Sequence, residues 1–276
     1  MKRALLPLFL LFAAGAASAE PLETYNNRLF LNVIVNGRPA IALLDSAAEM
    51  TMFDDDFAAG LGLVGAGGAT AHGSGAATMK ARFADHVRIE AAGVSLEARV
   101  GILDLGEVSA RLIGRPVGML LGRDLFDNAM LRIDIAGGMI AILEGAPRGV
   151  PLPLSEHRGT PAVPASVEGH APVRAVFDLG NGSEVMVGRA YAQAIGLLGP
   201  GRIIDRRSGG GLGGAREREI VSLRTLTLAG RTFRDVRAAI DPGETASDLN
   251  IGTSILRHFL IVTDFAGHRI WLEPKE

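Results

Sequence analysis

The chain has 276 residues, of which 48% are hydrophobic and 5% aromatic, and its formal net charge at pH 7 is −2. That length can fold around two hydrophobic cores, and the balanced charge gives no reason to expect a nucleic acid or an anionic membrane as a partner. The absence of cysteine excludes disulfides, thiolate catalysis and cysteine-ligated zinc.

The first 19 residues have the pattern of a secretory signal peptide. Residues 1–3 give a positively charged start, residues 4–16 are apolar or small apart from one proline, and residues 17–19 form an Ala-x-Ala cleavage site. The alternative is an uncleaved membrane anchor, but a spanning helix needs about 20 apolar residues. We therefore expect cleavage after residue 19 and no membrane span in the mature chain. A bacterial-type leader on a chain without cysteine predicts a periplasmic or secreted protein.

The first predicted β-hairpin ends at an aspartate. Residues 29–35 alternate between apolar and polar types, Asn36-Gly37 is a hairpin-turn signal, and the apolar run 40–44 leads directly to Asp45. A carboxylate at the end of a buried strand is costly to keep ionised unless it accepts hydrogen bonds or shares a proton. Taken alone, Asp45 fits a chemically active carboxylate and an ordinary capping aspartate equally well.

Three consecutive aspartates, residues 54–56, follow this hairpin. They invite a metal hypothesis, but no histidine or glutamate stands beside them at ligand spacing. The simpler interpretation is the N-cap and acidic first turn of a short helix, because negative charge is favoured at a helix N-terminus. We therefore expect a helix to start here and no metal site.

The pattern around Asp45 recurs around Asp178, which lies 133 residues later, about the length of one small domain. In both places an apolar run leads to the aspartate, and after a short polar or small stretch the sequence turns apolar again. Further pairs of similar segments follow: residues 60–63 with residues 195–198, and residues 119–126 with residues 250–256.

The closing segments of the two halves keep the same spacing. Gly122 precedes Asp134 by 12 residues, and Gly252 precedes Asp264 by 12. The sequence therefore indicates an internal duplication. Proline and glycine are concentrated in residues 146–153, which reads as a linker. The expected organisation is a signal peptide at 1–19, an N-terminal lobe at 20–147 and a C-terminal lobe at 148–276.

A hydrophobic–Asp–small–small motif, followed later by hydrophobic–hydrophobic–Gly before a closing strand, resembles the retropepsin-like aspartic protease family. Two such units in one chain resemble the bilobal, pepsin-like arrangement. The likeness extends over nearly all of the chain after residue 19. It implies an all-β fold of two tandem retropepsin-like β-barrel lobes, each with a short helix.

The resemblance also implies a reaction. Asp45 and Asp178, one from each lobe, would share one proton at the lobe interface. One then acts as a base on water and the other as an acid on the scissile carbonyl. This chemistry requires no external cofactor. The implied substrate is a peptide or protein, and a monomer suffices because one chain supplies both aspartates.

The residues after each aspartate depart from the Asp-Thr/Ser-Gly motif of that family. The first lobe has Ser46-Ala47, which keeps the hydroxyl but loses the glycine. The second has Leu179-Gly180, which keeps the glycine but loses the hydroxyl. In the resembled family the hydroxyl braces the two aspartate loops, so we expect half of the brace to be missing. Ala47 adds a methyl group at a close backbone approach, where we expect a need for glycine dihedrals.

Two glycine-rich segments are expected to form flaps over the substrate. Residues 65–76 feed into strands and match the family's flap hairpin by position. Residues 209–214 fit the pattern G-x-G-x-x-G, but a strand follows instead of a helix, so we interpret them as a hairpin tip of the second lobe. The flap residues assigned to substrate binding are Gly73, Ser74, Gly75, Gly210, Gly211 and Leu212.

Several arginines cluster around the second tip, and they fit either a solvated basic loop or a preference for acidic substrates: Arg202, Arg206, Arg207, Arg216 and Arg218.

Three interpretations remain open. The first is an active aspartic endopeptidase of the cell envelope. The second is a weak or inactive homologue that binds an extended peptide between the lobes. The third is a different exported β-protein. A serine hydrolase is not expected, because Ser74 is not in a G-x-S-x-G elbow and no helix is expected after it.

Overall fold

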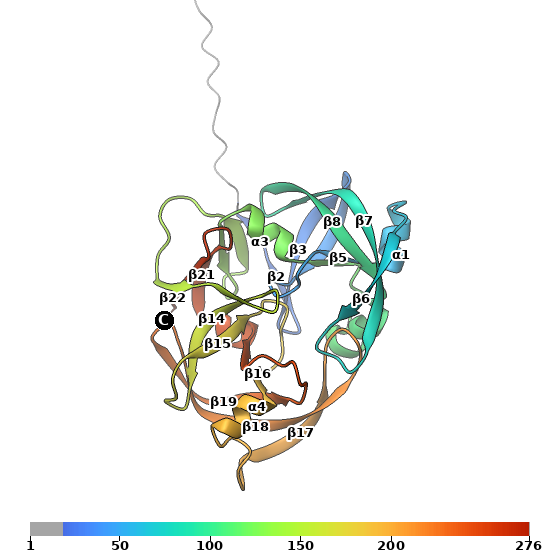
Figure 1. Cartoon of the computed structure of the whole chain (residues 1–276). Helices are drawn as coiled ribbons and strands as arrows, with labels where there is room; N and C mark the ends of the chain where they lie inside the picture. The colour runs from blue at the N-terminus through green and yellow to red at the C-terminus, as the bar shows by residue number, and fades with distance from the viewer. Residues whose placement is uncertain (1–18, 276) are drawn as a thin grey trace, which may run out of the picture.

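The computed structural model describes residues 19–275 and consists mainly of β-strands arranged in two lobes (Figure 1). The expected signal peptide lies outside the described residues apart from Ala19. The hairpin predicted ahead of Asp45 is present as β3 (Arg28–Val35) and β4 (Arg38–Leu44). None of the described helices is long and apolar enough to cross a membrane.

The N-terminal lobe is an eight-stranded sheet in the order β2-β3-β4-β9-β5-β8-β7-β6, and an extra pairing of β3 with β7 folds the sheet onto itself. Its remaining strands are β2 (Glu23–Tyr25), β5 (Met52–Asp54), β6 (Ala66–His72), β7 (Thr78–Ala91), β8 (Val94–Leu103) and β9 (Met119–Leu121). Its helices are α1 (Asp55–Gly60), α2 (Gly106–Val108), the π-helical turn η1 (Ser109–Ile113) and α3 (Arg123–Asn128).

The C-terminal lobe repeats this plan strand for strand, in the order β13-β14-β15-β20-β16-β19-β18-β17, with an extra pairing of β14 with β18. Its strands are β13 (Ser155–His157), β14 (Thr160–Val167), β15 (Val173–Phe177), β16 (Val185–Gly188), β17 (Ile203–Gly209), β18 (Arg216–Leu228), β19 (Arg231–Asp241) and β20 (Leu249–Ile251). Its helices are α4 (Arg189–Ala194) and α5 (Thr253–Leu256). Equal strand orders are what an internal duplication produces.

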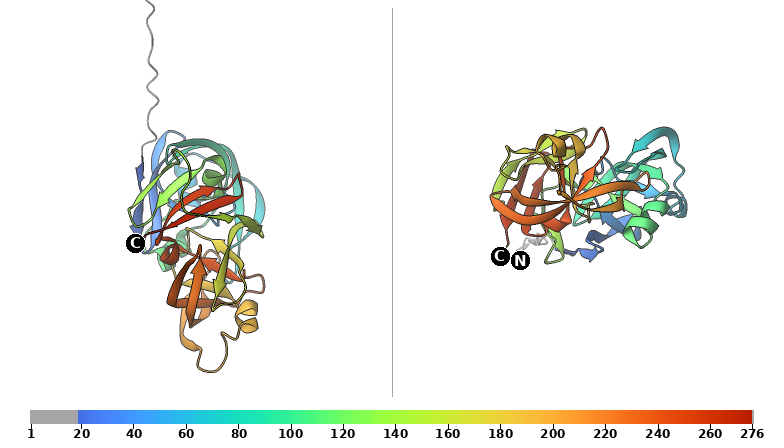
Figure 2. Two further views of the ribbon diagram at one scale, coloured as in Figure 1. Left: turned by 90° about the vertical axis from the view of Figure 1, so that its left-hand side faces the viewer. Right: turned by 90° about the horizontal axis from the view of Figure 1, so that it is seen from below.

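A third sheet of six strands joins the lobes, in the order β1-β11-β10-β21-β22-β12. Its strands are β1 (Glu20–Pro21), β10 (Leu131–Asp134), β11 (Met139–Ile142), β12 (Val150–Pro153), β21 (Phe259–Asp264) and β22 (Arg269–Pro274). Each half contributes a hairpin, and β10 pairs antiparallel with β21, so Leu131 lies opposite Thr263. In the left view of Figure 2 the red strands of the chain's end lie among the blue and green strands of the first half.

The duplicated Asp-x-x-Gly segments form the turns of these two hairpins. Asp134 Oδ1 accepts a hydrogen bond from the N–H of Gly137 at 2.7 Å, and Asp264 Oδ1 accepts one from Gly267 at 2.8 Å. A Cβ at either glycine would collide with the aspartate that it faces. Asp and Gly are three residues apart in both halves, and this equal spacing is therefore a requirement of the turns in the shared sheet.

The cores of the two lobes are continuous across the shared sheet. One buried apolar cluster includes Leu44 and Phe53 from the first lobe together with Phe177 from the second. The rings of Phe126 and Phe265 stack with centroids 5.0 Å apart, which links α3 to the end of β21. The two lobes are thus packed as one body around the aspartate loops.

The aspartate triplet begins α1, as the helix interpretation predicts. Asp54 is the N-cap, and its Oδ1 accepts a hydrogen bond from the N–H of Asp56 at 3.1 Å. Asp55 pairs instead with Arg82, with 2.5 Å between the charged atoms. The triplet therefore serves the helix and its neighbouring strand.

Candidate active site

Asp45 sits at the end of β4, where β4 pairs with β9 in parallel. Its backbone N–H donates to Leu121 O at 3.0 Å, which continues the ladder by one residue. Its carboxylate Oδ1 accepts hydrogen bonds from the N–H groups of Ala47 at 2.9 Å and Ala48 at 3.1 Å. The loop therefore folds back to hold one oxygen of a half-buried carboxyl group.

Asp178 is held in the same way at the end of β15. Its backbone N–H donates to Ile251 O at 3.1 Å. Its Oδ1 accepts from the N–H groups of Gly180 and Asn181, both at 2.9 Å. The duplicated sequence pattern thus becomes a duplicated geometry, in which two backbone donors hold one oxygen of each carboxyl group.

The two aspartate loops are in contact with each other. A Cβ at Gly180 would lie 2.5 Å from Asp45 Oδ2, closer than atoms can approach. Neither Gly180 nor Ala47 has a positive φ. The expectation that glycine dihedrals are needed at Ala47 is therefore wrong, and glycine is required at position 180 because the other lobe's carboxyl group occupies the space.

One side chain braces the two loops across the lobe interface. Ser46 is fully buried, and its Oγ donates to Phe177 O at 2.8 Å and accepts from the N–H of Leu179 at 2.9 Å. Leu179 has no hydroxyl to return these bonds, and its side chain packs in the apolar core instead. The brace is one-sided, as the sequence predicts.

The glycines of the duplicated closing motif lie directly behind the loops. A Cβ at Gly122 would lie 2.5 Å from Met50 O, and one at Gly252 would collide with Asn181 O. Thr51 Oγ1 also accepts from the N–H of Gly122 at 3.2 Å. The second half of the repeated pattern therefore supports the segment that carries each aspartate.

An asparagine distinguishes the second aspartate from the first. Asn250 is buried on β20, and its Nδ2 donates to Asp178 Oδ2 at 2.6 Å. Asn181 Nδ2 in turn donates to Asn250 Oδ1 at 2.8 Å, which fixes the orientation of that amide. Leu120 occupies the equivalent position in the first lobe, two residues before Gly122. Among the residues that the structure describes, Asp178 therefore has a side-chain donor that Asp45 lacks.

The pKa values of the two carboxyl groups respond to this asymmetry. Burial, and after it the negative charge of Asp178, raise the pKa of Asp45 to about 7. Burial also raises the pKa of Asp178, but the hydrogen bond from Asn250 and the two backbone N–H groups oppose that rise. Two interacting carboxyl groups in this environment hold their protons as a pair.

Arg28 places a buried positive charge beside the aspartates. Only 5% of its surface is exposed, and its Nη1 donates to Asn26 O at 3.1 Å. Burial lowers the pKa of this guanidinium, while the charges of Asp178 and Asp45 raise it. A Cβ at Gly182 would lie 2.8 Å from Arg28 Cγ, so the arginine stem runs directly under the second aspartate loop.

The two predicted flaps meet. The N–H of Gly75 donates to Leu212 O at 2.9 Å, and the N–H of Ala77 donates to Gly213 O at 2.7 Å. We call residues 73–77, from the β6–β7 hairpin, and residues 209–215, from the β17–β18 hairpin, the roof. Figure 1 shows these hairpins approaching each other from the two lobes.

The remaining flap residues are also in the roof contact. A Cβ at Gly73 would lie 2.6 Å from Leu212 Cβ, and one at Gly211 would lie 2.5 Å from Ser74 Oγ. Gly210 has φ +98°, a left-handed conformation that suits glycine at this bend. Leu212 packs on an apolar cluster of the N-terminal lobe that includes Leu43.

The arginines near the second tip divide into two groups. Arg202, Arg206 and Arg207 pair with acidic side chains of the same lobe, namely Glu168, Glu219 and Asp205. Arg216 and Arg218 instead donate to backbone oxygens of the N-terminal lobe's flap. Arg206 and Arg207 are exposed and fit the solvated-loop interpretation, whereas Arg202 forms a part-buried pair with Glu168. Arg216 and Arg218 are part of the roof.

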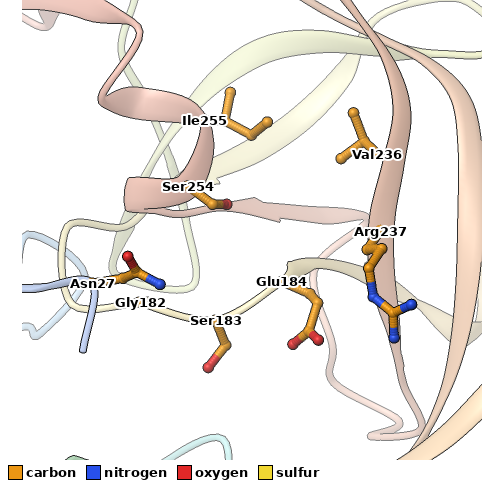
Figure 3. Close-up of a pocket in the computed structure, with 8 residues that line it drawn as sticks. All are labelled: Asn27, Gly182, Ser183, Glu184, Val236, Arg237, Ser254 and Ile255. Atoms are coloured by element: carbon orange, nitrogen blue, oxygen red, sulfur yellow. The ribbon is translucent and has the colours of Figure 1, made fainter.

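A hollow of about 440 Å³ adjoins the second aspartate loop (Figure 3). It is lined by Asn27, Gly182, Ser183, Glu184, Val236, Arg237, Ser254 and Ile255. Asn27 comes from the first lobe, and its carbonyl oxygen accepts a hydrogen bond from Thr253 Oγ1 at 2.6 Å. Neither Asp45 nor Asp178 lines the hollow, so it lies next to the aspartate site and is not part of it.

Both segments that carry the aspartates match one known protein family. The sequence model described as "Aspartyl protease" matches residues 31–125 and 163–255, which contain Asp45 and Asp178 respectively. The chain belongs to the aspartyl protease family. The predicted resemblance is thereby confirmed.

A solved structure supports the fold of this aspartyl protease family member. A crystal structure of an aspartic proteinase from Irpex lacteus superposes with a TM-score of 0.59 and 13% identity, and covers 95% of this chain and 98% of that one. At this identity the likeness concerns the fold alone, and it confirms the predicted all-β, bilobal architecture. A search of curated protein sequences finds none that matches this chain.

Sequence reasoning did not identify Asn250 or Arg28. Asn250 had a usable signal, because aligning Gly252 with Gly122 places a polar residue where the other half has Leu120. Arg28 had none, since its position depends on how the β2–β3 turn of one lobe reaches the loop of the other.

Proposed function

We propose that this chain is an aspartic endopeptidase in which Asp45 and Asp178 together activate water for peptide-bond hydrolysis. The observation that carries the proposal is the pair of touching loops, each of which holds one aspartate oxygen with two backbone N–H groups. The family membership supports a peptidase in general. The substrate would be an extended peptide that lies between the aspartate loops and the roof.

The donor from Asn250 assigns different roles to the two carboxyl groups. A donor favours the ionised form of its acceptor, so Asp178 is the carboxylate and Asp45 carries the shared proton. Asp178 accepts a proton as water attacks the scissile carbonyl carbon, and Asp45 donates its proton to the carbonyl oxygen. The resulting diol collapses when Asp178 passes its proton to the amide nitrogen and Asp45 regains one from a hydroxyl, which breaks the C–N bond.

Activity should require one proton on the pair. Since the pKa of Asp45 is raised to about 7, the pair keeps that proton through mildly acidic pH and loses it as the pH rises past about 7. Proteolysis should therefore decline on the alkaline side of neutrality, which a rate profile from pH 3 to 9 can record.

A second function is favoured by the one-sided brace. Leu179 supplies no hydroxyl, and Asn250 occupies an acceptor site on Asp178 Oδ2 that a water molecule would otherwise use. Both features fit a weak or inactive homologue that binds an extended peptide between the lobes without cutting it.

The deciding experiment is cleavage of an unfolded protein across pH 3 to 9. Wild type is compared with Asp45→Asn, Asp178→Asn and the control Asp56→Asn, which changes an exposed aspartate in α1. We expect wild type and the control to cut and both site variants to lose at least about a hundredfold in rate. If no protein cuts at any pH, the endopeptidase proposal fails, and the peptide-binding function is then tested by direct binding of an unfolded peptide.

We also propose that the chain is exported after cleavage at residue 19. Support comes from the place of Glu20 in the fold, since β1 begins at this residue and pairs with β11. Glu20 also accepts hydrogen bonds from the N–H groups of Ala92 and Gly93, both at 3.0 Å. N-terminal sequencing of the protein from bacterial periplasm should begin at Glu20; retention of residues 1–19 would contradict it.

A further inference from the structure

Three arginines converge on the roof. Arg111, from η1 of the N-terminal lobe, donates to Gly209 O at 3.1 Å and Gly211 O at 3.0 Å. Arg216 and Arg218, from β18 of the C-terminal lobe, donate to Gly75 O at 2.9 Å and Ser74 O at 3.2 Å. Every one of these bonds crosses from one lobe to the other. We call Arg111, Arg216 and Arg218 the arginine cluster.

Arg218 lies deepest in the cluster. Only 7% of its surface is exposed, and its Nε is buried without a hydrogen-bond partner among the described residues. Its Nη1 contacts Met186 Sδ at 2.8 Å, and Met186 pairs with Asn250 in the sheet. Because Asn250 contacts Asp178, the Arg218 guanidinium lies between the roof and the strand beside the second aspartate.

The cluster is short of negative charge. Arg216 and Arg218 share one carboxylate, Asp241, and each lies 3.9 Å from it, beyond hydrogen-bond distance. Arg111 is paired with Glu107. Burial, and then the neighbouring positive charges, lower the pKa of Arg218, although Asp241 and Glu184 oppose this. A buried guanidinium with an unused donor and a distant counter-ion favours an added anion.

We infer that the arginine cluster is a subsite for a carboxylate of the substrate, and that the chain selects peptides carrying an acidic side chain or a free C-terminal carboxylate. The inference rests on the proposed binding of a peptide beneath the roof. In the closed roof, neutral backbone oxygens occupy the guanidinium donors. A carboxylate forms shorter and stronger bonds to arginine, often two at once, and so replaces these oxygens when a substrate parts the roof.

The opposing interpretation is that the arginines only hold the roof closed. In that case removal of a guanidinium would change the affinity for every peptide by the same factor. A carboxylate subsite instead predicts that removal lowers the affinity for acidic peptides and leaves that for neutral peptides nearly unchanged. The ratio of the two affinities therefore separates the interpretations.

Binding is measured by fluorescence anisotropy with the full mature chain carrying Asp178→Asn, so that the result does not depend on catalysis. One glutamate is moved through an otherwise neutral, C-terminally amidated peptide, and each peptide is compared with its glutamine twin. A further pair differs only in having a C-terminal acid or amide. The two sets of peptide pairs show whether the arginine cluster binds a side-chain carboxylate or a C-terminal carboxylate.

We expect at least one acidic peptide to bind about tenfold more tightly than its neutral twin. Adding Arg218→Gln should bring that affinity ratio close to one. Arg218→Lys should retain part of the preference for the acidic peptide, because lysine keeps the positive charge but cannot donate two parallel hydrogen bonds to a carboxylate. The control Arg206→Gln, on an exposed side chain of the same hairpin, should leave the ratio unchanged.

Two results would overturn the inference. One is equal binding of acidic and neutral peptides by the parent variant, and the other is a preference that survives Arg218→Gln. Neither result bears on proteolysis, which the cleavage assay with the aspartate variants tests separately. Thermal melting of each arginine variant checks that a lost preference does not reflect a lost fold.

Discussion

At the scale of single residues, one amide separates the roles of two otherwise equivalent aspartates. Both have equivalent backbone donors on Oδ1, and within the described part of the chain only Asp178 also receives a side-chain donor on Oδ2. The duplication therefore supplies matched loops, and the exchange of a leucine for Asn250 makes them chemically unequal. Because the donor acts on a carboxylate oxygen, its effect should appear in the pH dependence of the rate.

We expect Asn250→Leu to move the acid limb of the activity profile upward by about one pH unit, because the lost hydrogen bond stabilises the ionised Asp178. A rate profile from pH 3 to 9 measures the shift. Asn128→Leu, the same replacement at an exposed position at the end of α3, is the control. An unchanged acid limb in Asn250→Leu would contradict the assigned roles.

Asp45→Asn should stabilise the protein at neutral and higher pH. The pKa of Asp45 is about 7 in the fold against 3.8 as the ordinary value, so the folded state binds more protons between these values. Stability is therefore lost as the pH rises through this window, and a neutral amide removes the loss. The gain at pH 8 should be on the order of 1 kcal/mol, or a few degrees in Tm, and should vanish near pH 3. A lower Tm of Asp45→Asn than of wild type at pH 8 would contradict the prediction that ionised Asp45 destabilises the fold.

At the scale of elements, the aspartate loops depend on one hydroxyl that joins β4 to β15. Ser46→Ala leaves Phe177 O and the N–H of Leu179 buried without a partner. We expect a loss of about 2–4 kcal/mol in the free energy of unfolding, measured by urea titration. Ser155→Ala removes a part-buried hydroxyl with a single bond of 3.2 Å and should cost less than about 1 kcal/mol. Similar losses in both variants would mean that Ser46 is no special brace.

The sequence was sufficient for the elements that repeat. Two aspartates, two closing glycines and two glycine-rich tips were identified because each occurs once in each half. What the duplication does not encode is how the halves meet. The contact of Gly75 with Leu212, the passage of Arg28 under Gly182 and the turn of Arg218 toward Ser74 all depend on the angle between the lobes. The expectation at Ala47 failed for a different reason: Ala47 has no positive φ, and the need for glycine lies at position 180, where Asp45 occupies the space of a Cβ.

At the scale of the whole molecule, the shared sheet makes the halves interdependent. β10 and β21 are its central strands, and the stacked Phe126 and Phe265 rings lie across the same boundary. A half-chain would expose the edge of β10 together with an apolar face. Such an edge is a template for pairing with another strand.

We therefore expect residues 20–147, produced alone, to dimerise through β10 instead of remaining monomeric. Size-exclusion chromatography with light scattering measures the mass, and the full mature chain is the reference. Replacing Ile133, whose backbone N–H is directed at β21 in the full chain, with proline should return the fragment to a monomer, because proline lacks the N–H that an added strand needs. A monomeric, folded fragment without that change would show that the halves fold independently.

Leu212 competes with a substrate side chain for the same apolar surface of the N-terminal lobe. It packs on the apolar cluster that includes Leu43, which lies two residues before Asp45 and so faces the same side of the sheet. A substrate side chain that binds this surface must displace Leu212. Because Leu212 is part of the same chain, its local concentration at the surface is high. The affinity seen by any substrate is then the intrinsic affinity multiplied by the fraction of molecules whose roof is open. A change that favours opening would therefore tighten substrate binding without adding one contact to the substrate.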